Sequence, residues 1–278
     1  MTRTSAAACK GWAPPSGDKI EIREMEQSLS KHSLLWQTLL RDHREFRDRV
    51  ATFAECKLDR LRRPATMART ESDQLMRDLG KRLSIDLRPF MSDCHLDELH
   101  GSFALTRERI RDAGIDSLHN PGLGRVCYAL TRALKPNVVI ETGVAFGVTT
   151  AFFLKAMAAN DSGVLHSIDL PPLGKDLTGI FVPPDLKSRW RLHRGKSRRM
   201  LKPLLSTLPS VDIFLHDSLH TYRNMRFEYE TVWPHLRPGG ILISDDVALN
   251  QAFENFSLMG RPSFLAMDKS SLFGIAVK

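Results

Sequence analysis

The second half of the chain alternates short apolar runs with longer segments that are polar on one side. The segment from Tyr222 to His235 has helical spacing, and Leu236 to Gly240 would end it. The apolar runs between such segments have strand length, at about 138–140, 164–168, 190–193, 211–215 and 241–243. Short apolar runs indicate strands buried on both faces, and intervening helices favour parallel pairing. The pattern predicts an α/β fold with a doubly wound, mostly parallel sheet.

The C-terminal end of the chain has the pattern of a hairpin. Apolar residues at 264–267 and 272–277 flank a polar turn at 268–271. Two strands joined by so short a turn pair antiparallel. The sheet is therefore expected to finish in an antiparallel pair.

The N-terminal part is dense in charge and has helical spacing. Residues 1–22 are rich in Thr, Ser, Ala, Gly and Pro and are expected to form a flexible tail. Helices are predicted at about 24–62, 71–82 and 102–113. A capping signal, Thr70 to Asp73, precedes the second of these helices.

The first of these helices carries one apolar stripe. Its residues are Trp36, Leu39, Phe46, Val50 and Phe53. We divide the chain into the tail, a helical region at 23–118 and a domain at 119–278. The sequence leaves open whether the helical region packs against the sheet, forms a homo-oligomer, covers the active site or holds substrate.

The turn after the first strand of the domain has the residues of a nucleotide site. Glu141 follows the strand, and Gly143 and Gly147 lie four residues apart before a helix. Glycine lets a ligand lie against the backbone, and the helix N-terminus offers free N–H groups. A dinucleotide motif would need glycine at 145, where Ala145 stands, and no P-loop Gly-Lys-Ser/Thr follows. Asp169 ends the next strand, where a carboxylate can accept both hydroxyls of a ribose.

This glycine turn and Asp169 resemble the cofactor motif and the ribose-binding acid of class I S-adenosylmethionine-dependent methyltransferases. His216 to Tyr222 and Leu236 to Gly240 add a specific match. The resemblance covers about 119–278 and is closest to the bacterial small-molecule and sugar O-methyltransferases. It implies a seven-stranded Rossmann-like sheet, S-adenosylmethionine as cofactor and methyl transfer to a small hydroxylated metabolite or sugar. Phe146 departs from the family, which usually has a small residue there.

The resemblance also implies the residues that bind the cofactor. Glu141 would hold the amino-acid end of the cofactor or orient the glycine turn, formed by Gly143, Ala145 and Gly147. Asp169 would bind the ribose. Ser197 lies where the family contacts adenine, although it is equally placed to be the N-cap of the next helix.

Carboxylates at the ends of two further strands resemble a metal site. Asp217 follows one strand, and Asp245 with Asp246 follows another. In the resembling cation-dependent enzymes such a triad holds a divalent cation such as Mg²⁺, which favours ionisation of the acceptor hydroxyl. His220 stands where those relatives often place a general base, and His216 is the rival. The alternative is that these aspartates cap helices and the histidines are structural.

Composition bounds the partners. The net charge is +8, and the segment from Lys187 to Lys202 is basic with no acidic residue. A solvated face explains this segment better than nucleic-acid binding, which stays a minority interpretation. The cysteines have no metal-binding spacing, and no apolar run is long enough to span a membrane. A cytoplasmic protein with a small-molecule substrate and no membrane partner is expected.

Two alternatives to a small-molecule enzyme stay open. The basic segment favours a methyltransferase of RNA or another phosphorylated substrate. Phe146 favours a methyltransferase-fold module that has lost catalysis and acts by binding, because its ring would crowd the cofactor.

Overall fold

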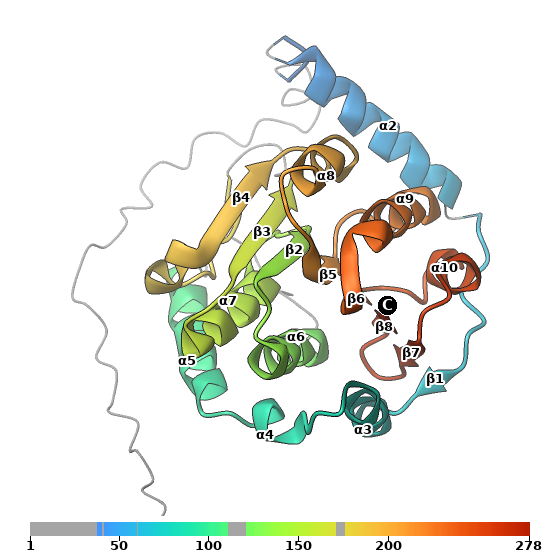
Figure 1. Cartoon of the computed structure of the whole chain (residues 1–278). Coiled ribbons are helices and arrows are strands. Elements are labelled where there is room, and N and C mark those ends of the chain that lie inside the picture. The colour runs from blue at the N-terminus through green and yellow to red at the C-terminus, as the bar shows by residue number, and fades with distance from the viewer. Residues whose placement is uncertain (1–37, 41, 60, 111–120, 171–175) are drawn as a thin grey trace, which may run out of the picture.

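The computed structural model describes residues 38–40, 42–59, 61–110, 121–170 and 176–278. Within these residues the centre is an eight-stranded sheet of order β1-β7-β8-β6-β5-β2-β3-β4 (Figure 1). All neighbouring strands are parallel except β8, which is antiparallel to β6 and β7. The strands are β1 (Arg69–Thr70), β2 (Val138–Thr142), β3 (Val164–Asp169), β4 (Trp190–Arg194), β5 (Val211–His216), β6 (Leu236–Ser244), β7 (Phe264–Asp268) and β8 (Gly274–Val277).

Helices cover both faces of the sheet. One face packs on α6 (Pro121–Leu134) and α7 (Val148–Asn160). The other face packs on α8 (Ser197–Leu205), α9 (Tyr222–Val232) and α10 (Ala252–Gly260) (Figure 1). Short 3-10 helices precede β4 and β6. Side chains are added to the hydrophobic cluster on the first face by α3 (Ser72–Leu83), α4 (Arg88–Met91), α5 (His95–Arg109) and η2 (Pro184–Arg189), and to the cluster on the second face by η3 (Trp233–His235). The helix α2 (His43–Asp59) belongs to neither cluster.

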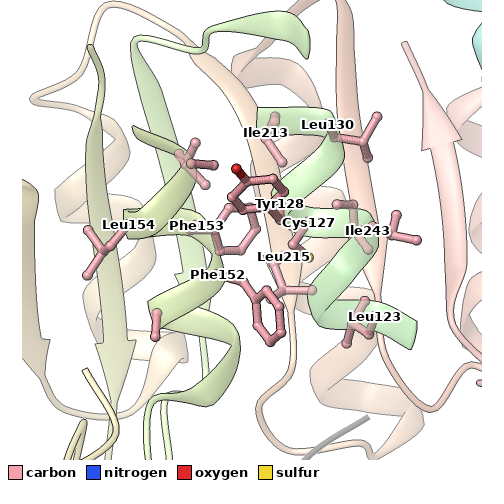
Figure 2. Packing of buried hydrophobic residues seen from close by; sticks show 14 of the residues in the cluster. Leu123, Cys127, Tyr128, Leu130, Phe152, Phe153, Leu154, Ile213, Leu215 and Ile243 are labelled. Carbon is pink, nitrogen blue, oxygen red and sulfur yellow. The ribbon is translucent and has the colours of Figure 1, made fainter. Parts of the chain in front are cut away.

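The core follows from the alternation of side chains along the strands. Ile213 and Leu215 of β5 face α6 and α7, whereas Phe214 between them faces the other helix layer. Figure 2 shows the side chains of Phe152 and Phe153 of α7 beside α6. Each fully buried side chain of this size contributes about 1.5–3 kcal/mol. The layers therefore hold the ends of β2, β3, β5 and β6 rigidly at one edge.

The doubly wound sheet and its terminal antiparallel pair are confirmed. Two details differ from the sequence prediction. The strand predicted to begin at Ile241 begins earlier, at Leu236, so the Pro-Gly-Gly stretch lies inside β6. The two-residue β1 extends the predicted seven strands to eight, because Arg69 and Thr70 pair with β7.

The helices of the N-terminal region also differ in detail. The helix predicted at 102–113 spans His95–Arg109, and residues 111–113 lie outside the described residues. The predicted cap of α3 is wrong: its N-cap is Glu71, without a side-chain hydrogen bond. The Ser72 hydroxyl donates to Asp268 at the end of β7 instead (2.5 Å).

The helix predicted at 24–62 is seen as α2, and its earlier part lies outside the described residues. α2 buries no residue completely, and it lies at the margin of the molecule beside α8 and α9 (Figure 1). Its apolar residues Val50 and Phe53 are 46% and 63% exposed. Packing of this stripe against the sheet is therefore excluded for these residues. Among the described helices, none is both long and apolar enough to cross a membrane.

Candidate functional site

The glycine turn joins β2 to α7. Gly143 and Gly147 have φ angles of +86° and +83°, which favour glycine. A Cβ on Gly143 would lie 1.9 Å from the carbonyl oxygen of Asp217, and one on Gly147 would lie 2.6 Å from the Cα of Gly179. Both glycines are therefore required by neighbouring backbone. Contact of the turn with a ligand stays a prediction.

Glu141 is completely buried at the end of β2. Its Oε2 accepts hydrogen bonds from the hydroxyls of Thr150 on α7 (2.8 Å) and Ser167 on β3 (2.7 Å). Burial raises the pKa of Glu141 to about 7, although both hydroxyls act against the rise. Glu141 thus ties the glycine turn to β3. Its Oε1 is buried and has no hydrogen-bond partner among the described residues.

Asp169 ends β3 next to the glycine turn. Burial raises the pKa of this carboxyl, while backbone N–H groups of Val144, Leu170 and Ala145 lower it less strongly. Its Oδ2 is buried without a hydrogen-bond partner in the described part of the chain. A buried acceptor with no donor is costly. The hydroxyl groups of a ribose would supply such donors.

Phe146, the residue that departs from the family pattern, is partly buried. Its side chain packs against the core cluster that includes Phe181 and Val182. The backbone carbonyl of Phe146 also accepts a hydrogen bond from the N–H of Phe181 (2.9 Å). The ring is therefore part of the packing beneath the glycine turn.

The ends of β5 and β6 bring acids and a histidine together. Ligand atoms of Asp217, His220 and Asp245 all lie within 4.8 Å of one another. Burial, then Asp245 and Glu141, raise the pKa of Asp217 well above its usual range. The grouping includes His220 in place of Asp246 of the sequence triad. Asp246 lies beside it, with Oδ2 3.8 Å from His220 Nε2.

His220 faces these acids through one ring nitrogen. Its Nε2 lies 3.7 Å from Asp217 Oδ1, beyond hydrogen-bond distance. Burial and the neighbouring His216 lower the pKa of His220 to about 3, so the ring is neutral at neutral pH. Within the described residues, Nδ1 has no hydrogen-bond partner. His216, the rival base, is completely buried and stacks edge-on against His220 with ring centroids 5.3 Å apart.

Glu228 on α9 is a residue that sequence reasoning missed. This buried carboxylate accepts hydrogen bonds from Thr142 (2.5 Å), Ser218 (2.8 Å) and Asn224 (3.0 Å). Its Oε2 also lies 2.6 Å from His216 Nδ1. The signal in the sequence was the position of Glu228, six residues after Tyr222, on the inner face of the predicted helix. Glu228 joins the ends of β2, β5 and α9 beneath the acids.

Ser197 is the first residue of α8, and Lys196 is the N-cap. The N-cap alternative for Ser197 is therefore wrong. Its side chain is buried, and its hydroxyl helps to lower the pKa of Glu228. A contact of Ser197 with adenine stays a prediction.

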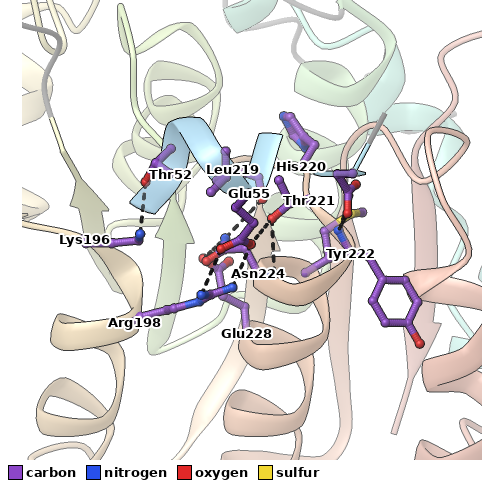
Figure 3. A network of polar contacts seen from close by, with 12 residues as sticks. Thr52, Glu55, Lys196, Arg198, Leu219, His220, Thr221, Tyr222, Asn224 and Glu228 are labelled. Carbon is purple, nitrogen blue, oxygen red and sulfur yellow. Dashed lines mark hydrogen bonds and ion pairs between the residues drawn. The ribbon is translucent and has the colours of Figure 1, made fainter. Parts of the chain in front are cut away.

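The basic segment from Lys187 to Lys202, which runs into α8, is partly neutralised by α2. Arg198 donates two hydrogen bonds to Glu55 (2.9 and 3.1 Å), and Lys196 donates to Thr52 (3.0 Å). Figure 3 shows these contacts beside Thr221, which also bonds to Glu55. The polar side of α2 is thus bound across the strand ends next to the candidate site.

Comparison with known proteins agrees with this geometry. Residues 140–247 match the family model described as "Methyltransferase domain". A protein of Mycobacterium sp. (strain JLS), inferred to be an O-methyltransferase, is 30% identical over 148 residues, which are 52% of this chain and 64% of the relative. The match thus spans less than two thirds of that relative.

A solved structure has a similar fold. The O-methyltransferase from Bacillus cereus, in complex with SAH, aligns with a TM-score of 0.50 at 14% identity, over 67% of this chain and 92% of the other. The family match begins in β2 and ends just after β6, so it contains the glycine turn and Asp169. It also contains Asp217, His220 and Asp245, which we call the Asp217 group. On this evidence residues 140–247 are similar to a methyltransferase domain, and the fold is like that of a solved O-methyltransferase.

Proposed function

We propose that the protein is an O-methyltransferase that transfers a methyl group from S-adenosylmethionine to a hydroxyl group of a small molecule. The observation that carries the proposal is the meeting of Asp217, His220 and Asp245 at the strand edge that also holds Asp169. Ligands of doubly wound sheets bind at this edge. When bound, S-adenosylmethionine supplies the methyl group, and a divalent cation supplies positive charge that favours the ionised acceptor oxygen.

The residues present fit the cofactor. Asp169 offers a buried acceptor atom with no partner in the described chain, which is what two ribose hydroxyls would satisfy. The N-terminus of α7 follows the glycine turn and offers unpaired N–H groups. The relative from Bacillus cereus holds SAH, which supports a cofactor of this class here.

The residues also fit a divalent cation. Carboxylate oxygens are ligands that Mg²⁺ and Mn²⁺ accept, and an imidazole nitrogen extends the set to other transition metals. The raised pKa of Asp217 records repulsion from Asp245 and Glu141 as well as burial. A bound cation would offset that repulsion. We propose Asp217 and Asp245 as its ligands, with Asp246, whose Oδ2 lies 3.8 Å from His220 Nε2, as a further candidate.

We propose His220 as the group that accepts the hydroxyl proton. A general base must be unprotonated, and burial keeps this ring neutral. Its Nε2 faces Asp217 and Asp246, so a hydroxyl that approaches the acids also approaches this nitrogen. His216 is committed to Glu228 through Nδ1, which favours a supporting role for it.

The two alternatives lose support. Binding of RNA would use the basic segment, but α2 pairs with Arg198 and Arg199 there. A cofactor site blocked by Phe146 would need the ring in the cleft, whereas the ring packs against the core.

Calorimetric titration with S-adenosylmethionine tests the cofactor site. Asp169→Ala is expected to weaken affinity at least about tenfold, because charge-assisted hydrogen bonds contribute about 1.5–3 kcal/mol each. The exposed Asp185→Ala is the matched control and should bind as the wild type does. Unchanged affinity in folded Asp169→Ala would place the ribose site elsewhere.

A screen of hydroxylated acceptors with methyl-labelled cofactor then tests the reaction. Activity is expected to vanish with EDTA and to return with Mg²⁺ or Mn²⁺. His220→Ala should lower turnover by about 10²–10⁴-fold while cofactor affinity is kept. Full activity in EDTA together with a silent His220→Ala would refute the cation and the base.

A further inference from the structure

In α2 the polar side faces the protein and the apolar side faces solvent, which is the reverse of an ordinary surface helix. Its inner side, which faces α8 and α9, is polar, and its acids are all engaged there or within the helix. Glu45 pairs with Arg49, Asp48 with Arg199, Glu55 with Arg198 and Asp59 with Arg62. The Asp59 carboxylate also accepts the backbone N–H of Tyr222 at the start of α9 (3.0 Å).

The side that faces away from the domain is apolar and basic. We call it the outer face of α2. Within 43–59 the exposed residues are His43, Arg44, Arg47, Val50, Ala51, Phe53, Ala54, Lys57 and Leu58. The set contains no acid. Leu61 and Arg63, just after the helix, are also exposed.

The apolar residues of this face are unusually open to solvent. Phe53 is 63% exposed and Leu58 is 68% exposed, and Leu61 reaches 83%. The Lys57 ammonium lies over the Phe53 ring, 4.6 Å from its centroid. A face that combines large apolar side chains with cations that have no acidic partner in the described part of the chain costs free energy in water. It therefore calls for a partner that is apolar and negatively charged.

We infer that the outer face of α2 binds the surface of an anionic lipid bilayer. Helices that lie in the bilayer interface place Phe and Leu among the acyl chains and Lys or Arg at the headgroups. Phe53, Leu58 and Leu61 are the insertion residues, and Arg47 and Lys57 lie where they can reach lipid phosphates. Such a helix lies along the membrane and needs no spanning segment. The expectation of no membrane partner rested on the lack of a spanning run, and that argument does not apply to a helix of this kind.

Charge favours this partner over a second copy of the chain. If two α2 helices packed antiparallel around Val50 and Phe53, Arg47 of each copy would lie beside Lys57 of the other. Like charges in that register repel, and the outer face offers no acid within residues 43–59 to compensate. An anionic bilayer supplies the missing charge, and the polar contacts of Glu55 and Asp59 keep the domain above the surface.

Vesicle flotation with the full chain tests the inference and needs neither cofactor nor acceptor. Vesicles of phosphatidylcholine with phosphatidylglycerol are expected to bind the protein at low salt. Vesicles of phosphatidylcholine alone should bind at least about tenfold more weakly, because each cation near an anionic surface contributes about fivefold. High salt should also weaken binding, since it screens exposed charges.

Two variants separate the contributions of the outer face. Phe53→Ser with Leu58→Ser is expected to abolish binding, and Arg47→Glu with Lys57→Glu to weaken it at least about tenfold. All four side chains are exposed, so circular dichroism and thermal unfolding should stay at wild-type values. Leu258→Ser on α10, which is 76% exposed, is the matched control and should bind normally.

Three outcomes would overturn the inference. The first is equal binding to both kinds of vesicle. The second is binding that neither double variant changes. The third is absence of vesicle binding, and light scattering would then show whether a dimer sensitive to Phe53→Ser takes its place.

Discussion

Two carboxylates beside the end of β5 have opposite surroundings. Glu228 is saturated with donors, among them the hydroxyls of Thr142 and Ser218. Burial alone would raise its pKa, but His216 and the hydroxyls of Ser197 and Thr142 outweigh burial and hold the pKa of Glu228 well below its usual range. Asp217 faces other acids, and its pKa is raised. A buried carboxylate whose oxygens all accept hydrogen bonds, such as Glu228, stabilises the fold. A carboxylate that faces other acids, such as Asp217, can still accept a ligand.

The largest expected difference is in stability. Glu228→Gln removes the charge that pairs with buried His216, and breaking such a pair costs about 3–5 kcal/mol in the free energy of unfolding. Asp217→Asn should leave that free energy unchanged or raise it, because it relieves repulsion. Urea unfolding at neutral pH without divalent cations measures both. Equal losses in the two variants would remove the distinction between the two acids.

Within the described residues, Glu141 has fewer hydrogen-bond donors than Glu228 but more than Asp217, and its raised pKa makes the stability of the protein depend on pH. Its pKa is raised from 4.5 to about 7 in the folded protein. The folded state therefore holds the proton more tightly, so the stabilisation is complete below pH 4.5 and is lost as the pH rises through 7. Relative to Glu141→Gln, the wild type should lose about 3 kcal/mol of unfolding free energy over that interval.

Urea titrations of both proteins without cofactor, at several pH values, measure this loss. If the difference in unfolding free energy between the wild type and Glu141→Gln stays constant from acid to neutral pH, ionisation of Glu141 does not destabilise the fold. The Ser167 and Thr150 hydroxyls would then satisfy the carboxylate fully.

The smallest expected difference separates two neighbouring aspartates. Asp245→Asn removes a member of the Asp217 group and should weaken Mn²⁺ affinity at least about tenfold. Asp246→Asn changes a residue outside that group and should have a smaller effect. Titration calorimetry with Mn²⁺ compares them. If Asp246→Asn has the larger effect, the triad expected from the sequence describes the cation site better than the grouping in the structure.

The sequence determined the elements and which of them carry acids. Apolar runs predict the strands, because burial on both faces requires continuous apolar residues. Since parallel strands end at one edge, Asp169, Asp217 and Asp245 could be assigned to that edge in advance. These patterns are local, which is why they could be interpreted without coordinates. The added strand β1 has only two residues and no pattern of its own, so it could not be predicted.

Tertiary structure decided what each polar group contacts. The sequence marks Gly143 as part of a nucleotide-site pattern, and only the structure shows that the carbonyl of Asp217 also leaves no room there for a Cβ. Glu228 looks like one more helical acid, and only packing on β2 and β5 makes it a buried acceptor. The apolar stripe of α2 predicts a helix but not its direction. Glu55 and Asp59 set that direction by binding α8 and α9, because ion pairs between elements depend on approach in space rather than on spacing along the chain.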